Sequence, residues 1–241
     1  MNSECKFLIE IVKEASTLLN NHFEVFKKGE DGDLVTNLDF MIEKFLTQKI
    51  KEKYPDFDIV GEEFNSKART NQNWFTIDPI DGTINFAHGF PLWAIQVACV
   101  KNGKTVAGVI YAPEFDELYY ADETGAYLNG EKLSLKSLPV NQSLTMVLGK
   151  NFYPKMLADG REQFIKTRDI FCGALSYAYF VSGKMQALAI DIDLAPWDKT
   201  PGDLMCEQIG AYKFKKGDLT IYSSSQEYLD EILRQIGEKN N

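Results

Sequence analysis

The stretch Asp78-Pro79-Ile80-Asp81-Gly82-Thr83 follows the apolar run 74–77 and carries two carboxylates three residues apart. Because proline lacks an amide proton and glycine adopts conformations that other residues avoid, this stretch is typical of a turn. We therefore expect Asp78 and Asp81 to lie where a strand of a sheet ends and a loop begins. Loops at such positions often carry binding and catalytic residues.

Two carboxylates held close together repel each other unless a cation lies between them. Two further acidic turns, Glu62-Glu63 and Trp197-Asp198, each follow an apolar segment. Carboxylate oxygens, backbone carbonyls such as that of Ile80, and water are the ligands that Mg²⁺ prefers. The three acidic turns therefore predict a single magnesium site.

The overall composition agrees with a metal site. The chain has 241 residues, is 44% hydrophobic and carries a formal net charge of −9. This length and apolar content suffice for a substantial core. The acidic balance argues against a general nucleic-acid surface, which needs clustered Lys and Arg. An acidic protein also repels a phosphate substrate unless bound cations invert the local field, so activity on phosphate implies bound metal.

The cysteines and the N-terminal sequence favour a cytoplasmic protein. The four cysteines, Cys5, Cys99, Cys172 and Cys206, have no Cys-x-x-Cys spacing and read as reduced thiols. Charged residues interrupt the apolar positions of the N-terminal segment, which therefore reads as an amphipathic helix rather than a signal peptide. No apolar run approaches the length that spans a membrane.

Hydrophobic periodicity predicts a mixture of helices and strands. The N-terminal half is expected to contain a long helix from residue 3 to about 28, a helix over 37–53, strands at 57–60 and 74–77, and a β-meander over 92–135 with Asn-Gly turns at 102–103 and 129–130. The C-terminal half is expected to contain strands at 143–148, 185–192, 212–214 and 220–222, and helices at 173–182, 200–210 and 226–236.

Four segments in this order resemble the inositol monophosphatase family. They are Asp33-Leu34-Val35-Thr36-Asn37-Leu38-Asp39, Gly61-Glu62-Glu63, the stretch 78–83 and Pro196-Trp197-Asp198, supported by Gly173-Ala174-Leu175 and the segment 183–187. The resemblance implies an α+β fold, the layered α/β/α/β/α sandwich of the inositol monophosphatase and fructose-1,6-bisphosphatase type. It also implies one domain over 1–241, with an α+β half at about 1–140 and an α/β half at about 141–241.

The resemblance also assigns roles to individual residues. Glu62, Asp78 and the Ile80 carbonyl would hold one Mg²⁺, and Asp78, Asp81 and Asp198 a second, while Glu62 would hold a third, weaker ion or the attacking water. Thr83 and Asp39 would orient that water, so the implied catalytic residues are Asp39, Glu62 and Thr83. The implied substrate contacts are Asp81, Gly82, Thr83, Gly173, Ala174, Asp191 and Asp198. The amides of Gly82 and Thr83 could open a short helix and bind phosphate oxygens.

Each acidic residue also has an ordinary structural interpretation. Asp81 before a glycine is common in turns, Asp198 could cap the helix that carries Pro201, and Asp39 could face solvent on its helix. If each residue is considered alone, a turn role is preferred for Asp81 and a capping role for Asp198. The motifs together favour metal binding by Glu62, Asp78, Asp81 and Asp198.

The resulting hypothesis is a Mg²⁺-dependent phosphatase that hydrolyses a small phosphate monoester with metal-activated water. The default substrate is myo-inositol monophosphate. Asp191 stands where inositol-selective members commonly have a longer Glu, and Lys150 and Lys199 add positive charge that a second phosphate would need. Fructose-1,6-bisphosphatase, NADP phosphatase and 3′-phosphonucleotide phosphatase activities therefore stay open.

The resemblance further implies a homodimer and lithium sensitivity. The non-enzymatic alternative is a transcription-associated binding module, because some relatives are linked to RNA polymerase.

Overall fold

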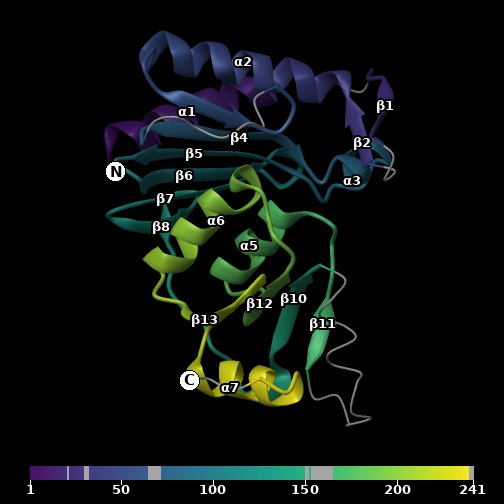
Figure 1. Ribbon diagram of the computed structural model, residues 1–241, viewed down its shortest axis with the longest axis vertical. Helices are drawn as coiled ribbons and strands as arrows, with labels where there is room; N and C mark the ends of the chain where they lie inside the picture. Colours follow the sequence, from purple (N-terminus) through teal and green to yellow (C-terminus); the bar gives the residue numbers. More distant parts are fainter. Residues whose placement is uncertain (21, 30–32, 65–71, 150–151, 153–164, 239–241) are drawn as a thin grey trace.

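The computed structural model describes residues 1–20, 22–29, 33–64, 72–149, 152 and 165–238. It consists of five layers (Figure 1): helices α1 (Ser3–Ser16) and α2 (Asn37–Lys53), a seven-stranded sheet, helices α5 (Gly173–Val181) and α6 (Pro196–Gln208), a five-stranded sheet, and helix α7 (Gln226–Gln235). The predicted α/β/α/β/α sandwich is confirmed. No helix within the described ranges has both the length and the apolar content needed to cross a membrane.

The seven-stranded sheet contains the predicted meander. Its strands, in spatial order, are β3 (Asp58–Gly61), β4 (Trp74–Asp81), β5 (Ala94–Lys101), β6 (Lys104–Ala112), β7 (Glu117–Asp122), β8 (Gly125–Leu128) and β9 (Glu131–Lys132). Strand β3 is parallel to β4, and every other neighbouring pair is antiparallel. Both Asn-Gly turns have positive φ at the asparagine and the glycine, as tight hairpin turns require.

The five-stranded sheet lies below the α5 and α6 layer. Its spatial order is β11 (Lys166–Arg168), β10 (Leu144–Leu148), β12 (Ala187–Asp191), β14 (Leu219–Ser223) and β13 (Tyr212–Lys216). Strand β10 is parallel to both of its neighbours, and the two remaining pairs are antiparallel. The other elements are the hairpin of β1 (Val25–Lys28) and β2 (Asp33–Thr36), the short helix α3 (Thr83–Ala87), and 3-10 turns at Pro113–Phe115 and Val140–Gln142.

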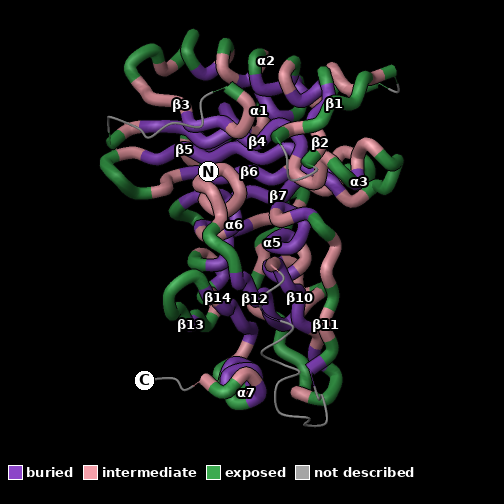
Figure 2. Tube along the Cα trace, turned by 45° about the vertical axis from the view of Figure 1, so that its right-hand side comes forward, coloured by how far each residue is buried: buried purple, intermediate pink, exposed green. Residues whose placement is uncertain are grey.

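Hydrophobic cores fill the spaces between these layers, and Figure 2 shows the central strands of both sheets as largely buried. One core lies between α1, α2 and the seven-stranded sheet, and a second lies between α5, α6 and both sheets. The third joins the five-stranded sheet to α7. The second core is shared by the two sheets and places the start of α5 and α6 next to β4.

Three predicted boundaries differ from the structure by four residues or more. Helix α1 ends at Ser16 instead of about residue 28, and residues 25–28 form β1. The apolar residues Leu19 and Phe23, which extended the helical pattern, still pack against the first core from a non-helical segment. Helix α6 begins at Pro196 rather than at residue 200. The third difference, the length of β4, shapes the site.

Candidate active site

The stretch 78–81, expected to be a turn, forms the last part of β4. Asp78 pairs with Gln96 of β5, and Asp81 pairs with Ala94. The two aspartates are three residues apart on β4, but their partners are only two residues apart on β5. This β-bulge inserts one extra residue, and Pro79 lies within it, where the ladder is interrupted. Side chains alternate along a regular strand, so an odd spacing would place the two aspartates on opposite faces. The bulge puts Asp78 and Asp81 on the same face.

That face points toward α5 and α6. Ala94, the partner of Asp81, belongs to the core that contains α5 and α6, whereas Ile77 belongs to the core under α1 and α2. Asp81 Oδ1 accepts a hydrogen bond of 3.1 Å from Gly173 N, and the Ala174 amide donates to the same carboxylate. The first turn of α5 therefore binds Asp81 through its backbone amides, as helix N-termini bind anions.

Glu62 follows β3 and lies beside the end of β4. Its backbone amide donates to the Ile77 carbonyl at 3.2 Å, which continues the parallel pairing by one residue. Lys28 Nζ from the β1–β2 hairpin lies 2.7 Å from Glu62 Oε1 and 2.8 Å from Glu63 Oε1. The Glu62 side chain is 25% exposed, whereas that of Glu63 is 3% exposed. Glu63 is thus a buried, ion-paired carboxylate.

Asp39 lies in the first turn of α2 and is completely buried. Its Oδ2 accepts hydrogen bonds from Thr36 N at 2.7 Å and Thr36 Oγ1 at 2.6 Å, so the alternative that Asp39 faces solvent is wrong. The Thr83 hydroxyl lies 3.4 Å from Asp39 Oδ1 and donates to the Ile80 carbonyl at 2.8 Å. The structure therefore brings together Asp39, Thr83 and the Ile80 carbonyl. Gly82, with φ 88°, precedes the short helix α3 as predicted.

Asp198 is the third residue of α6, and its Oδ2 accepts a 3.2 Å hydrogen bond from Ala195 N. It therefore caps the helix from within the first turn rather than from the N-cap position, and its predicted metal role is compatible with this. Asp191 is the last residue of β12 and is buried.

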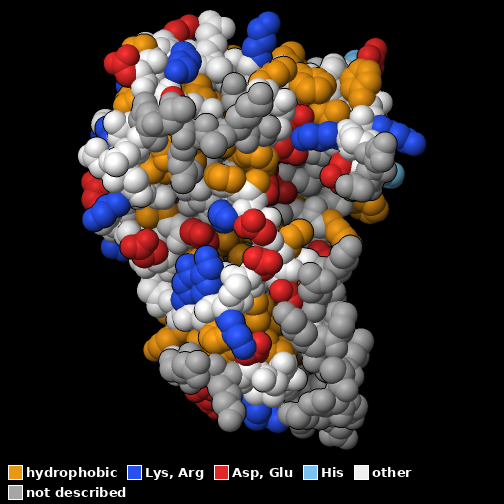
Figure 3. Space-filling view, viewed as in Figure 1, with side chains coloured by type: hydrophobic (Ala, Val, Ile, Leu, Met, Phe, Trp, Pro, Cys, Tyr) orange, Lys and Arg blue, Asp and Glu red, His pale blue; other side chains and the backbone are white. Residues whose placement is uncertain are grey.

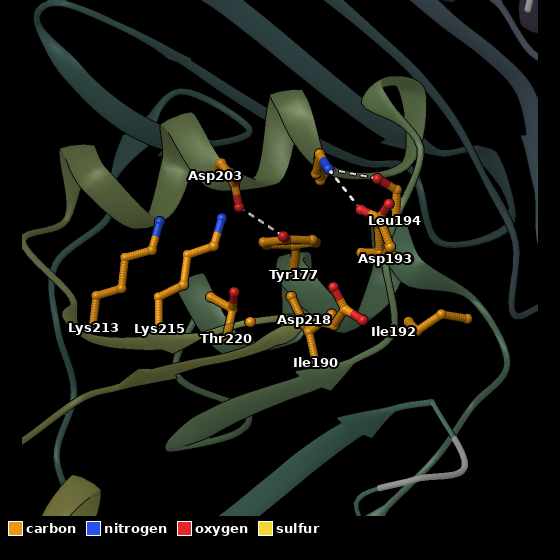
Figure 4. Close-up of a pocket in the computed structure, with 12 residues that line it drawn as sticks. Tyr177, Ile190, Ile192, Asp193, Leu194, Asp203, Lys213, Lys215, Asp218 and Thr220 are labelled. Carbon is orange, nitrogen blue, oxygen red and sulfur yellow. Dashed lines mark hydrogen bonds and ion pairs between the residues drawn. The ribbon is translucent and has the colours of Figure 1, made fainter. Parts of the chain in front are cut away.

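Of the two lysines predicted to bind a second phosphate, the structure describes only Lys199. Lys150 lies outside the described residues. Lys199 Nζ is 2.5 Å from the Leu194 carbonyl and 3.7 Å from Asp193 Oδ1, and it lines a cavity of about 190 Å³ between α6 and the β13–β14 hairpin (Figure 4). Of the predicted ligands, neither Asp78, Asp81 nor Asp198 lines this cavity.

Burial and mutual repulsion raise the pKa values of the clustered aspartates. Burial, followed by the charge of Glu62, raises the pKa of Asp78 well above its usual range, and the charges of Asp81 and Asp198 add to this. Burial is also the largest cause for Asp81, whose pKa rises to about 6, and for Asp198, whose pKa rises to about 7. The charge of Glu62 contributes to the raised pKa of all three aspartates, and the charge of Asp81 contributes to those of Asp78 and Asp198.

The donor set fits a hard cation. Within the described ranges, no three His, Cys, Asp or Glu side chains lie together closely enough to hold a metal ion as they stand. Asp78 Oδ1, however, is buried and has no hydrogen-bond partner there. A buried carboxylate oxygen without a partner is costly unless a cation or a donor satisfies it. Oxygen donors of this kind suit Mg²⁺ rather than a soft metal.

Comparison with known proteins decides the family. A family model described as the inositol monophosphatase family matches residues 2–233. This chain belongs to that family. The fructose-1,6-bisphosphatase/inositol-1-monophosphatase of Thermotoga maritima is 29% identical over 257 residues, which cover 97% of this chain and 98% of the relative. The histidinol-phosphatase of Chlorobaculum parvum is 30% identical over 211 residues, which cover 82% and 80%.

The solved structure of a Thermotoga maritima IMPase superposes with a TM-score of 0.83 and 27% identity, covering 96% of each chain. Members of this family are phosphatases that generally depend on a metal and hydrolyse phosphoric monoesters. The family membership therefore confirms the predicted fold and reaction class: the chain is a phosphoric monoester hydrolase.

Sequence reasoning missed three side chains at this site. Lys28 pairs with two glutamates, Glu43 of α2 accepts hydrogen bonds from Glu63 N at 2.7 Å and Phe64 N at 3.1 Å, and Gln96 contacts both aspartates of β4. A polar residue at an apolar position of a strand was the available signal for Gln96. Glu43 stands four residues after Asp39 on the same helix face, which was the signal for a second buried carboxylate.

Proposed function

We propose that this chain catalyses Mg²⁺-dependent hydrolysis of a small phosphate monoester, with myo-inositol monophosphate as the default substrate. The observation that supports this most directly is the buried group of aspartates around Asp78, whose Oδ1 has no hydrogen-bond partner among the described residues. Such a group is stabilised by cations, and cations are what an acidic protein needs to bind a phosphate dianion.

The predicted ligand sets are carried forward as part of this proposal. Glu62, Asp78 and the Ile80 carbonyl would hold one ion, and Asp78, Asp81 and Asp198 another, with two or three ions in all. When bound, Mg²⁺ neutralises charge on the phosphoryl group and lowers the pKa of water.

The remaining residues would bind and orient the reactants. Asp39, completely buried and fixed by Thr36, would accept a hydrogen bond from Thr83, and the Thr83 hydroxyl would in turn orient the attacking water. The amides of Gly82 and Thr83, at the start of α3, would bind phosphate oxygens. Asp191, Gly173 and Ala174 would contact the alcohol part of the substrate.

The location and assembly of the protein are also proposals. All four cysteines are buried and free, which supports a cytoplasmic location. By resemblance to the family, we also propose a homodimer and inhibition by lithium. Light scattering of the purified protein and turnover at millimolar lithium test these two points separately.

Phosphate release tests the proposed reaction. The substrate panel should contain inositol monophosphates, fructose 1,6-bisphosphate, histidinol phosphate, NADP and 3′-phosphoadenosine 5′-phosphate, each with and without Mg²⁺. We expect Mg²⁺-dependent release that Asp81→Asn lowers by at least about 100-fold, since a carboxylate ligand is lost. The matched control is Asp122→Asn, because Asp122 is buried at the end of β7 and bonds Asn2 and Thr124 instead. A folded wild type that releases no phosphate from any compound would contradict the proposal.

A further inference from the structure

Gln96 of β5 is completely buried and contacts both aspartates of β4. Its Nε2 lies 3.3 Å from Asp78 Oδ2 and 3.1 Å from Asp81 Oδ2. Among the side-chain hydrogen bonds of the described residues, no other group joins these two carboxylates. The two N–H groups of one side-chain amide therefore donate one hydrogen bond to each of two carboxylates that repel each other.

The contact follows from strand register. Gln96 is directly opposite Asp78, and residues opposite each other in an antiparallel pair project to the same face. Ala94, two residues away on the same face, is opposite Asp81, and its small side chain leaves the Gln96 amide within reach of Asp81. The β4 bulge thus creates a three-residue cluster: Gln96, Asp78 and Asp81.

Ordinary packing does not account for this glutamine. A buried amide that serves only the fold is normally satisfied at both ends. Gln96 Oε1 is buried without a hydrogen-bond partner among the described residues, and so is Asp78 Oδ1. One cluster thus contains two buried oxygens with unused lone pairs, at the position where the proposed function requires a cation.

We propose that Gln96 is a positioning residue of the metal site: its amide holds the Asp78 and Asp81 carboxylates side by side so that both bind the same Mg²⁺. This inference rests on the proposed function, because it assumes that these aspartates are metal ligands. The partners that hydrogen-bond a ligating carboxylate fix its orientation, and their loss typically lowers metal affinity or activity by about 10- to 100-fold.

The direct test is replacement of Gln96 by Leu, which has a similar volume and no donor. The matched control is Gln186→Leu. Gln186 is also buried and directly precedes β12. Its side chain makes two hydrogen bonds, accepting from Leu144 N at 3.0 Å and donating to the Gly183 carbonyl at 3.1 Å. Both substitutions remove a buried, hydrogen-bonded side-chain amide, but only Gln96→Leu removes contacts with carboxylates.

Calorimetric titration of the metal-free, folded proteins with MgCl₂ is the measurement. We expect Gln96→Leu to weaken Mg²⁺ binding at least about tenfold and Gln186→Leu to leave it within about twofold of the wild type. In the phosphatase assay, the Mg²⁺ concentration for half-maximal rate should rise by the same factor in Gln96→Leu, with kcat at saturating Mg²⁺ largely recovered. A purely structural role would lower thermal stability alike in both variants without this shift.

The possible results distinguish the positioning role of Gln96 from the proposed phosphatase function. Wild-type Mg²⁺ affinity in a folded Gln96→Leu protein overturns the inference and leaves the proposed function intact. Absence of Mg²⁺ binding by the wild type overturns both. If Gln96→Leu does not fold, Gln96→Met, a longer and more flexible apolar side chain, replaces it. Failure of both variants to fold shows that Gln96 is required for packing and overturns the positioning role.

Discussion

At the scale of single residues, the candidate site shows charges that reduce stability. Asp39 is completely buried, and although Thr36 donates two hydrogen bonds to it, burial raises its pKa from 3.8 to about 6. A carboxyl whose pKa is higher in the folded state binds its proton more tightly when folded. The metal-free protein therefore loses stability as pH rises from about 4 through about 6, and Asp39 contributes to this loss together with Asp81 and Asp198, whose pKa values are also raised.

Asp39→Asn should remove that contribution. Two pKa units correspond to about 3 kcal/mol, and asparagine forfeits part of the Thr36 contact, so we expect the free energy of unfolding to rise by about 1–2 kcal/mol at pH 8. At pH 4 the substitution should give no gain, because Asp39 is then protonated. Urea denaturation at the two pH values measures this, and phosphate release should fall if Asp39 acts through Thr83. Equal effects at pH 4 and pH 8 would refute the pH argument.

Position 61 requires glycine, because the Glu43 side chain approaches the backbone there too closely for a Cβ atom. A Cβ on Gly61 would lie 2.1 Å from Glu43 Oε1, and Glu43 is held in place by the amides of Glu63 and Phe64. We expect Gly61→Ala to lower the free energy of unfolding by about 1–3 kcal/mol and to weaken Mg²⁺ binding by displacing Glu62. In a Glu43→Ala background, which provides space, the same substitution should have little further effect on stability. Additive losses in the double mutant would argue against the steric explanation.

At the scale of elements, local sequence patterns predicted helices and strands correctly where those patterns determine the structure. They failed where contacts between elements determine it. Helix α2 was predicted over its full range, because its apolar spacing continues to Lys53 and Tyr54-Pro55 follows. The β1–β2 hairpin was missed, because Leu19 and Phe23 fit a helical repeat while packing from a non-helical segment.

The same limit applies to the site. The acidic turns predicted Glu62, Asp78, Asp81 and Asp198 as one group, and the family resemblance added Asp39. The structure places these residues in one region. The bulge that aligns Asp78 with Asp81 depends on pairing with β5, which no local pattern of β4 reveals. The position of Gln96 in an otherwise apolar strand marked it as unusual, but its contact with both aspartates depends on the same pairing.

The contact between α5 and α6 gives a test at the scale of elements. A Cβ on Gly202 of α6 would lie 2.2 Å from the ring of Tyr177, which is buried and whose hydroxyl donates to Asp203 Oδ1 at 2.7 Å. Alanine favours a helix over glycine by about 1 kcal/mol, but the clash should dominate, so we expect Gly202→Ala to destabilise the protein by about 2–3 kcal/mol. Chemical denaturation measures this, with Gly202→Ala in a Tyr177→Ala background as the control that restores space. A stabilised single mutant would show that the helices separate easily.

At the scale of the whole molecule, charge is balanced on the face shown in Figure 3. Basic and acidic side chains lie side by side over α6 and the five-stranded sheet. Three lysines and three aspartates line the cavity there, and Lys213 and Lys215 extend from β13 toward α6 and Asp203 (Figure 4). Because its lysines and aspartates balance, this cavity does not present the net positive charge that an anion-binding site needs. Around Asp78, in contrast, the charges of Glu62, Asp81 and Asp198 add to burial in raising its pKa.

The core shared by α5, α6 and both sheets predicts how the whole chain unfolds. It contains Ala94 and Ile110 from the seven-stranded sheet and Met146 and Leu188 from the five-stranded sheet. Neither half can lose its structure without exposing apolar surface of the other, so we propose that residues 1–241 form one domain with one unfolding transition. Scanning calorimetry should give a single peak whose calorimetric and van't Hoff enthalpies agree. Mg²⁺ should shift the whole peak upward, because a ligand that binds only the folded state stabilises every part coupled to it. Two separated peaks, only one of which moves with Mg²⁺, would instead show that the halves at about 1–140 and 141–241 are independent domains.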